Sequence, residues 1–488
     1  MTAVTSAPAP LTPAEQSTAT RPSNVREGSR VVIVGGGPGG YEAALVARQL
    51  GAKVTVVERQ GPGGSAVLTD VVPSKTLIAT AELMTVTESS KELGIRPAGG
   101  HDGSMEVDFA TVDRRVLELA AAQSRDIRTR LEREGVALVD GEGRLQGPSM
   151  VVATTAYGEQ RLTADVVLIA TGARPRVLPT AEPDGERILT WTQLYTLTEL
   201  PERLIVVGSG VTGAEFAGAY NALGADVVLV SSRDRVLPGE DSDAAELIES
   251  VFKRRGMEVL SRSRAAAVRR AGDGVEVELA DGRVVTGSHC LLAVGAVPNT
   301  EDLGLESAGV KVKPSGHIEV DRVSRTTARG VYAAGDCTGV LALASVAAMQ
   351  GRIGMWHSLG DAVSPLDLGQ VSANIFTAPE IATVGIPESQ ITSGEVRGAV
   401  TMLPLARNPR AKMLGIREGF VKLFSHRASG LVLGGVVVAP RASELIFPIT
   451  LAISHRLTVD QVASAFTVYP SLSGSIAETA RTLHDARG

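Results

Sequence analysis

Two glycine-rich turns, each expected to join a short apolar strand to a helix, constrain the fold of this 488-residue chain more than any other feature. The first turn, GGGPGG at residues 35–40, follows a β-branched run at Arg30–Val34 and precedes an expected helix at Tyr41–Leu50. A second apolar run follows at Val54–Val57. Continuous apolar runs of this kind are typical of strands buried on both faces of a parallel sheet. We therefore expect a doubly wound α/β unit.

The glycines of the first turn have separate tasks in such a unit. Gly35 makes the tight turn, Gly37 lets the backbone approach a pyrophosphate, and Gly40 lets helix and strand pack closely. Backbone amides at the start of the helix point toward the phosphates. Glu58, at the end of the second strand, is placed to accept the ribose hydroxyls of an adenosine. The spacing predicts a dinucleotide site, and a glycine-rich turn without a ligand is the alternative.

The second turn, GSGVTG at residues 208–213, repeats the spacing. Its glycines are Gly208, Gly210 and Gly213, and an apolar run at Leu204–Val207 precedes them. The chain therefore contains two expected dinucleotide-binding folds.

The strand expected at Val227–Val230 ends differently from its counterpart, in Ser231, Ser232 and Arg233 instead of an acid. A carboxylate there would accept a hydrogen bond from a ribose 2′-hydroxyl and repel a 2′-phosphate, whereas hydroxyls and an arginine do the reverse. We expect NADPH to be preferred, with Arg233 or Arg235 as the phosphate partner. NADH stays open, because a solvated loop arginine is the alternative reading.

A third motif, GVYAAGD at residues 330–336, resembles the second FAD motif of flavoproteins that bind two dinucleotides. In those proteins the aspartate holds the ribityl or pyrophosphate part of the flavin, which implies this role for Gly335 and Asp336. Thr171 and Gly172 follow a strand expected at Val166–Ile169 and lie in a segment similar to the crossover between FAD and NAD(P) domains. The resemblance implies FAD at the first fold and NADPH or NADH as co-substrate at the second.

From about residue 30 to 480 the order of motifs is similar to that of class I pyridine nucleotide-disulfide oxidoreductases, the family of dihydrolipoamide dehydrogenase and glutathione reductase. Residues 63–75 look like the redox-active helix of that family, Gly-Gly-Thr-Cys-x-x-x-x-Cys-x-Pro-Ser-Lys. The two cysteine positions carry Ala66 and Val71. A methyl or an isopropyl group cannot accept electrons from a flavin or attack a disulfide. The resemblance therefore implies a flavoprotein without disulfide chemistry.

A second departure lies near the C-terminus. The family carries His-Pro-Thr-x-x-Glu there, a base and its orienting acid supplied across the dimer, but this chain has Tyr469 and Gly474 at those two positions. Without a thiol to deprotonate, the base and acid have no task. Drift in an inactive protein would also remove these groups. Tyr469 is a candidate hydrogen-bond donor to an acceptor oxygen, with simple packing as the alternative.

Two other functional positions match the family. Lys75 and Glu215 correspond to residues that pair beside the flavin N5 and the nicotinamide, where a cation favours the anionic reduced flavin. An ordinary ion pair between helices is the alternative. Residues 375–385 and 419–422 look like parts of the interface domain of the family, which implies a homodimer.

We therefore expect an α/β chain with two Rossmann-like dinucleotide-binding domains and a C-terminal α+β dimerisation domain. The expected boundaries are a disordered tail at 1–28, the first part of the FAD-binding domain at 29–185, the NAD(P)-binding domain at 186–298, the second part of the FAD-binding domain at 299–368 and the interface domain at 369–488.

Composition excludes several other classes of protein. The formal net charge of −6 argues against a nucleic-acid partner. No apolar run reaches the 18 or so residues that a membrane span requires. Cys290 and Cys337 lie far apart, and the seven histidines form no ligand spacing, so neither a disulfide nor a metal site is expected. A cytoplasmic location fits this cysteine usage.

The resemblance points to an NAD(P)H:quinone oxidoreductase. NADPH or NADH would pass a hydride to FAD N5, and the electrons would go directly to a small quinone. Ala66 and Val71 would form an apolar surface that favours a flat apolar acceptor. Alternatives are a soluble pyridine nucleotide transhydrogenase and a non-catalytic flavoprotein that senses redox state. Lys75 and Glu215 argue against the latter, since a protein that only holds FAD needs neither.

Overall fold

The first nucleotide-binding unit is built on a five-stranded parallel sheet in the order β18-β7-β1-β2-β3. The computed structural model describes residues 28–95 and 105–485, so the tail expected at 1–28 lies outside the described residues except for Gly28. The strands are β1 (Arg30–Val34), β2 (Lys53–Glu58), β3 (Ala137–Asp140), β7 (Val166–Ile169) and β18 (Val331–Ala333).

Both faces of this sheet are covered, which explains why its strands are apolar throughout. Ile33 packs among the side chains of two helices, α1 (Pro38–Gln49) and α7 (Ala344–Leu359). Its neighbour Val34 packs on the opposite face against a small antiparallel sheet. That sheet consists of β4 (Glu142–Leu145), β5 (Met150–Thr155) and β6 (Gly158–Thr163).

The second nucleotide-binding unit repeats this plan with the strand order β12-β11-β10-β16-β9. Val206 packs against α5 (Val211–Ala222) and α6 (Ser242–Arg254), and Ile205 packs on the other face against an antiparallel sheet. The strands of the parallel sheet are β9 (Ile188–Thr190), β10 (Arg203–Val207), β11 (Asp226–Val230), β12 (Glu258–Leu260) and β16 (His289–Leu292). The antiparallel sheet consists of β13 (Ala265–Ala271), β14 (Gly274–Leu279) and β15 (Val284–Gly287).

A two-stranded antiparallel ribbon carries the chain between the two units. It pairs β8 (Ala173–Pro175) with β17 (Ala296–Pro298). The Thr171 hydroxyl donates to the carbonyl oxygen of Asn299 at 2.6 Å, and the Asn299 side-chain amide donates to the Thr171 carbonyl at 2.9 Å. These bonds close the crossover at its end nearest β7.

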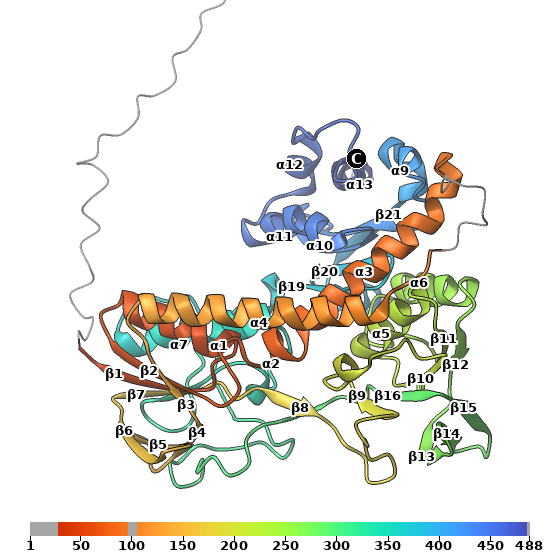
Figure 1. The fold of residues 1–488 in the computed structure, drawn as a ribbon. Coiled ribbons are helices and arrows are strands. Elements are labelled where there is room, and N and C mark those ends of the chain that lie inside the picture. The colour runs from red at the N-terminus through yellow and green to blue at the C-terminus, as the bar shows by residue number, and fades with distance from the viewer. Residues whose placement is uncertain (1–27, 96–104, 486–488) are drawn as a thin grey trace, which may run out of the picture.

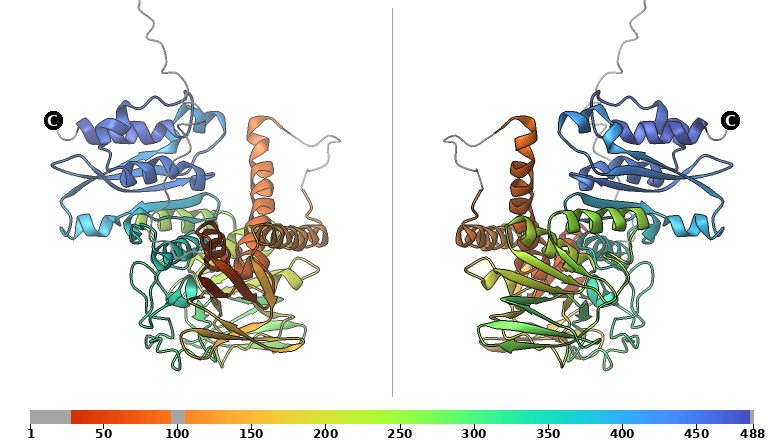
Figure 2. Two further views of the ribbon diagram at one scale, coloured as in Figure 1. Left: turned by 90° about the vertical axis from the view of Figure 1, so that its left-hand side faces the viewer. Right: turned by 90° about the vertical axis from the view of Figure 1, so that its right-hand side faces the viewer.

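Two long helices connect the parts of the molecule. The α4 helix (Phe109–Arg133) runs along both nucleotide-binding units, and α3 (Val71–Ser90) rises from them beside the C-terminal domain (Figure 1). The short α2 helix (Gly64–Leu68) precedes α3. In the side views of Figure 2, α3 stands at the same height as the C-terminal sheet. Within residues 28–95 and 105–485, none of the helices is both long enough and apolar enough to cross a bilayer.

The C-terminal domain is a five-stranded antiparallel sheet in the order β19-β20-β23-β22-β21. One face joins the core of the second nucleotide-binding unit through residues such as Val436, and the other face packs helices through residues such as Val437. The strands are β19 (Ser372–Ile375), β20 (Glu380–Gly385), β21 (Gly398–Pro404), β22 (Phe420–His426) and β23 (Val432–Ala439). The helices are α8 (Glu388–Thr392), α9 (Pro409–Met413), α10 (Ala442–Leu445), α11 (Phe447–Ser454), α12 (Val459–Ser464) and α13 (Gly474–Asp485).

The predicted fold class is confirmed: two Rossmann-like units precede a C-terminal domain of sheet and helices. The predicted strands Arg30–Val34 and Val166–Ile169 have the observed bounds, whereas β2 extends one residue beyond the predicted run at each end. The domain boundaries that we assigned from the motifs stay a prediction.

Candidate active site

The first glycine turn leaves open space at one glycine and none at the others. A Cβ on Gly35 would lie 2.3 Å from the carbonyl oxygen of Ala170, and a Cβ on Gly40 would lie 1.9 Å from the carbonyl oxygen of Gly35. No atom lies within 4 Å of the position that a Cβ on Gly37 would take. The packing of strand and helix therefore requires two of the glycines, while the third presents bare backbone to an open space.

The second turn shows the same division. A Cβ on Gly208 would lie 2.2 Å from the carbonyl oxygen of Ala293, and one on Gly213 would lie 1.8 Å from that of Gly208. Gly210 again faces open space. An open glycine at the start of a helix lets backbone N–H groups approach a pyrophosphate. Both turns therefore fit a dinucleotide.

Glu58 lies at the rim of the first turn and holds its backbone. Its Oε2 accepts a hydrogen bond from the Gly36 N–H at 2.6 Å, and its Oε1 accepts from the Gln60 N–H at 2.7 Å. A carboxylate has about four acceptor positions, so these bonds leave capacity for ribose hydroxyls. The contact with ribose stays a prediction.

The third motif meets the first turn in space. The position of a Cβ on Gly39 lies 3.1 Å from the Cβ of Ala334, directly before Gly335. The Gly335 N–H donates to the Oε1 atom of the buried Gln350 at 2.9 Å. Asp336 follows, half-buried, and burial raises the pKa of its carboxyl. The structure thus brings together two of the segments that we assigned to FAD.

The loop after β11 separates the residues that we assigned to the 2′-phosphate. Ser231 has no exposed surface, and its Oγ lies 2.6 Å from the Oγ of Ser209 in the glycine turn. It also accepts a hydrogen bond from the Arg233 N–H at 3.1 Å. This burial corrects the expectation that Ser231 contacts the nucleotide, because its hydroxyl instead fixes the shape of the loop. Ser232 and Arg233 are exposed, and their contact with a phosphate stays a prediction.

The segment that resembles the redox-active helix lies against the first glycine turn. The Gly63 N–H donates to the carbonyl oxygen of Gly36 at 2.8 Å. Ala66 lies in α2 and Val71 begins α3, and both are half-buried. The segment therefore offers a methyl and an isopropyl group beside the candidate flavin site.

The two cysteines do not replace the missing pair of thiols. Cys290 and Cys337 are free, and neither has any exposed surface. Burial raises the pKa of the Cys337 thiol to about 11 and raises that of Cys290 as well. Buried thiols of this kind are poor nucleophiles.

Lys75 and Glu215, which we assigned to catalysis, form an ion pair. The Lys75 Nζ lies 2.7 Å from the Oε2 of Glu215, and the Oε1 of Glu215 accepts the backbone N–H of Phe376 at 2.9 Å. The Lys75 ammonium also lies 5.0 Å from the centre of the Phe376 ring, within reach of a cation–π interaction. Glu215 is 4% exposed and Lys75 is 27% exposed, so the acid is buried and the cation faces outward.

Sequence reasoning missed two polar groups beside this ion pair. Asp70 lies between α2 and α3, and Tyr195 lies under them at 5% exposure. The Tyr195 hydroxyl is buried and lies near the Ser74 side chain of α3. Nothing in the sequence singled out either residue, because neither is a defining residue of a motif of known function.

Tyr469 is not brought together with Lys75 and Glu215 within one chain. It lies between α12 and α13 and is 82% exposed. Its neighbours Phe466 and Val468 are exposed as well. A contact with the flavin site of a second copy stays a prediction.

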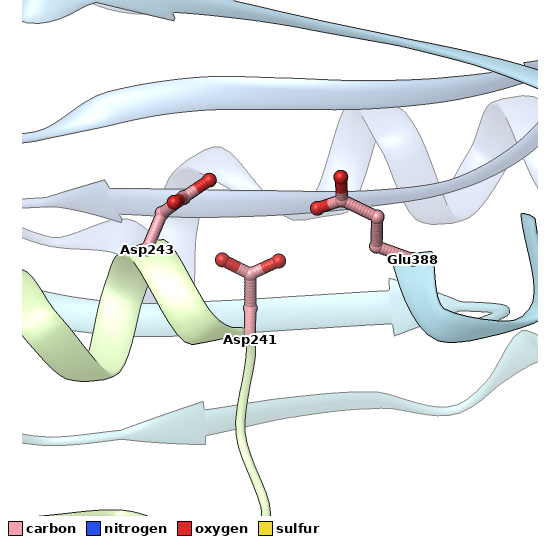
Figure 3. A group of neighbouring side chains, drawn as sticks. All are labelled: Asp241, Asp243 and Glu388. Carbon is pink, nitrogen blue, oxygen red and sulfur yellow. The ribbon is translucent and has the colours of Figure 1, made fainter. Parts of the chain in front are cut away.

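A group of three carboxylates lies where the second unit meets the C-terminal domain (Figure 3). Asp241 and Asp243 belong to the start of α6, and Glu388 belongs to α8. The Nζ of Lys422 lies 2.6–2.9 Å from oxygens of all three side chains. An ammonium already occupies the centre of the group, so the group is a salt-bridge network that joins two domains rather than a metal site. These carboxylates hold the pKa of Lys422 above its usual range, although its burial opposes the shift.

Several proteins of known name or structure are similar to this chain. A relative named NAD(P)H dehydrogenase (quinone), from Mycobacterium tuberculosis, is 53% identical over 469 residues, which cover 94% of each chain. The dihydrolipoyl dehydrogenase of Zymomonas mobilis is 32% identical over 455 residues, 92% of this chain and 96% of that protein. The crystal structure of LpdA from Mycobacterium tuberculosis matches with a TM-score of 0.89 at 53% identity, covering 93% of this chain and 99% of that one.

Family models agree with these relatives. Residues 29–351 match the model described as pyridine nucleotide-disulphide oxidoreductase, and residues 371–480 match the dimerisation domain of the same family. FAD and NAD(P)H are the cofactors of this family, and the two glycine turns fit them. The chain therefore belongs to the pyridine nucleotide-disulphide oxidoreductase family.

Proposed function

We propose that this chain is an FAD-dependent NAD(P)H:quinone oxidoreductase that passes electrons to its acceptor without a disulfide relay. The contrast within one short segment carries the proposal. Lys75 is paired with Glu215 at 2.7 Å, while Ala66 and Val71 stand at the two thiol positions. Neither of these two side chains contains sulfur, so they cannot form the disulfide that relays electrons in other members of the family. The name of the 53% identical relative, NAD(P)H dehydrogenase (quinone), supports the same activity.

The residues around the first glycine turn would hold FAD, which supplies a carrier that takes a hydride equivalent from the nicotinamide and passes it to the second substrate. The backbone at Gly37 would face the pyrophosphate, since nothing of the protein fills that space. The full set proposed for FAD is Gly35, Gly37, Gly40, Glu58, Lys75, Thr171, Gly172, Gly335 and Asp336.

Lys75 and Glu215 would act as catalytic residues through charge. Lys75 presents its ammonium to the site, and Glu215 holds it from the buried side. A fixed cation stabilises negative charge that develops during reduction, and it does so without reorganising at that moment. The bond from Phe376 to Glu215 keeps the acid from turning away.

The nicotinamide nucleotide would bind at the second turn, along Gly208, Gly210 and Gly213. Ser232 and Arg233 would contact the 2′-phosphate of NADPH, because a hydroxyl and a guanidinium both donate to phosphate oxygens. NADH remains an accepted donor in this proposal.

The acceptor would be a small quinone bound on the apolar surface of Ala66 and Val71. The enzyme would act as a homodimer, and the dimerisation domain and the exposed Phe447 and Phe466 support a partner surface. Tyr469 of one copy would then donate a hydrogen bond to the quinone in the other. A cytoplasmic location is part of the proposal, and the two free cysteines agree with it.

Anaerobic titration of the FAD-loaded protein with NADPH tests the absence of a relay. We expect the flavin absorbance to bleach directly, without the long-wavelength band that a thiolate beside a flavin produces. Steady-state assays with menadione, lipoamide, oxidised glutathione and thio-NAD identify the acceptor. Brisk turnover of lipoamide or glutathione would contradict the proposal, turnover of thio-NAD alone would favour a transhydrogenase, and reduction that takes minutes would favour a non-catalytic flavoprotein.

The role of Tyr469 has its own test. Tyr469→Phe removes one hydroxyl and should slow oxidation by quinone several-fold, with reduction by NADPH unchanged. Stopped-flow measurement of the two half-reactions separates these effects. An unchanged quinone rate would remove Tyr469 from the mechanism.

A further inference from the structure

Asp70 is the carboxyl group next to the position of the second missing thiol. It precedes Val71, and its backbone carbonyl accepts the Ser74 N–H at 2.8 Å, which starts α3. No hydrogen bond or ion pair of its side chain is found within residues 28–95 and 105–485. The carboxyl is half-buried, belongs to the residue directly before one of the two thiol positions, and has no polar partner among the described residues.

The charged groups that act on Asp70 are those of the proposed active site. Lys75 on α3 stabilises the ionised form, while Glu215 on α5 and Asp336 after β18 disfavour it. Asp70 is thus within electrostatic reach of the groups proposed for catalysis and of the acid proposed for FAD.

Tyr195 is a second polar group in this region, and it is buried near Asp70. Its side chain is 5% exposed, its ring packs 6.5 Å from that of Phe216, and its hydroxyl lies near the Ser74 side chain. Burial and the nearby Asp70 raise the pKa of this phenol. Polar groups withdrawn from solvent are normally paired, so the Asp70 carboxyl, for which no partner is found among the described residues, indicates a site that a ligand completes.

We propose that Asp70 is the acid that protonates the quinone. The inference rests on the proposed function. Reduction of a quinone requires two electrons and two protons. The hydride equivalent from NAD(P)H brings both electrons and one proton. Asp70 supplies the other: its O–H bond breaks, an O–H bond forms on the acceptor oxygen, and the carboxylate regains a proton from water.

The environment of Asp70 suits this task. Burial, opposed by Lys75 and aided by Glu215 and Asp336, raises the pKa of its carboxyl to about 6. A general acid is most effective when its pKa lies near the working pH. An aspartate in water would be ionised at pH 7 and would have no proton to give.

Asp70→Asn tests the proposal, with Asp113→Asn as the matched control. Burial alone raises the pKa of Asp113, on α4, to about 6, and no charged group of the proposed site contributes to that shift. For Asp70→Asn we expect oxidation of the reduced enzyme by menadione to slow about 100-fold at pH 6, the usual loss for a general acid. Reduction by NADPH should change less than twofold, Asp70→Glu should recover part of the rate, and the control should match the wild type.

A spectroscopic readout does not depend on turnover. The absorbance of the bound, oxidised flavin should shift slightly with a midpoint near pH 6 in the wild type and in Asp113→Asn, but not in Asp70→Asn. Absence of this shift from the wild type would overturn the placement of Asp70. A wild-type rate of oxidation by menadione that does not change between pH 5 and 8 would overturn its role as an acid, even if the variants failed to fold. If the wild type titrates near pH 6 but reduces no quinone, the proposed function fails and Asp70 is still a flavin-site acid.

Discussion

Replacing Asp70 by asparagine should stabilise the folded protein near neutral pH. The pKa of its carboxyl rises from 3.8 to about 6 on folding, chiefly because the group is buried. Between these values the folded state keeps a proton that the unfolded state has released. The free energy of unfolding therefore falls as the pH rises from about 4 to 6, and the full cost remains above pH 6. Asparagine has no charge to bury and avoids this cost.

The size of the effect follows from the shift. A difference of about 2 pKa units corresponds to about 3 kcal/mol. Asp70 keeps some contact with solvent, which screens part of the cost, so we expect Asp70→Asn to raise the free energy of unfolding at pH 7.5 by about 1–2 kcal/mol. The linkage relation gives about half of this gain at pH 5. The start of α3 should not suffer, because asparagine is as good as aspartate at a helix N-terminus.

Urea unfolding of the FAD-loaded protein at pH 5 and pH 7.5 measures the gain. Trp191 reports on the correct region, because it packs in the same apolar cluster as Leu77 of α3 and Tyr195. The gain in the free energy of unfolding should depend on pH in a similar way for Asp113→Asn, since burial also raises the pKa of Asp113 to about 6. If Asp70→Asn lowered stability at pH 7.5, or shifted it equally at both values, the carboxylate would be well paired when charged, and our account of the site would be wrong.

Further variants test other parts of the structure. Lys422→Met leaves Asp241 at 6% exposure without its cation and should cost about 3–5 kcal/mol, seen as a lower thermal midpoint that Lys422→Met/Asp241→Asn partly restores. Arg233→Ala should raise the KM for NADPH about tenfold and leave that for NADH nearly unchanged; equal changes would contradict a phosphate contact. Gly37→Ala should fold normally and bind FAD weakly, whereas Gly40→Ala should fail to fold, because its Cβ would meet a carbonyl oxygen at 1.9 Å; circular dichroism and flavin content separate the two outcomes.

The features that sequence predicted well are those that depend on local spacing. Gly35 and Gly40 are five residues apart because one turn must pass between a strand and the helix packed on it. Any chain with that turn needs small residues at both positions, so the spacing alone predicts strand, turn and helix. The same reasoning found β7, since a fully buried strand must be apolar along its whole length.

The features that sequence missed depend on contacts between distant segments. Asp70 and Tyr195 are 125 residues apart, and only the fold brings them to one site. Ser231 was assigned to the phosphate by residue type, but its hydroxyl points inward to Ser209. The type of a residue does not predict the direction of its side chain after a strand. Lys422 looked like an ordinary strand residue, although it holds three carboxylates from two other elements.

The position of Glu215 explains how the acceptor can change while the rest of the site stays the same. One of its oxygens binds Lys75 on α3, and the other binds the N–H of Phe376, where the C-terminal domain begins. These bonds fix α3 against α5 without involving Ala66 or Val71, whose side chains are apolar and hold no polar group in place. Loss of a thiol at either position therefore breaks no contact that orients the charges. In the proposed function, the acceptor depends on the short segment 66–71 and the nucleotides depend on the glycine turns and on Lys75 and Glu215, so either part can vary without disturbing the other.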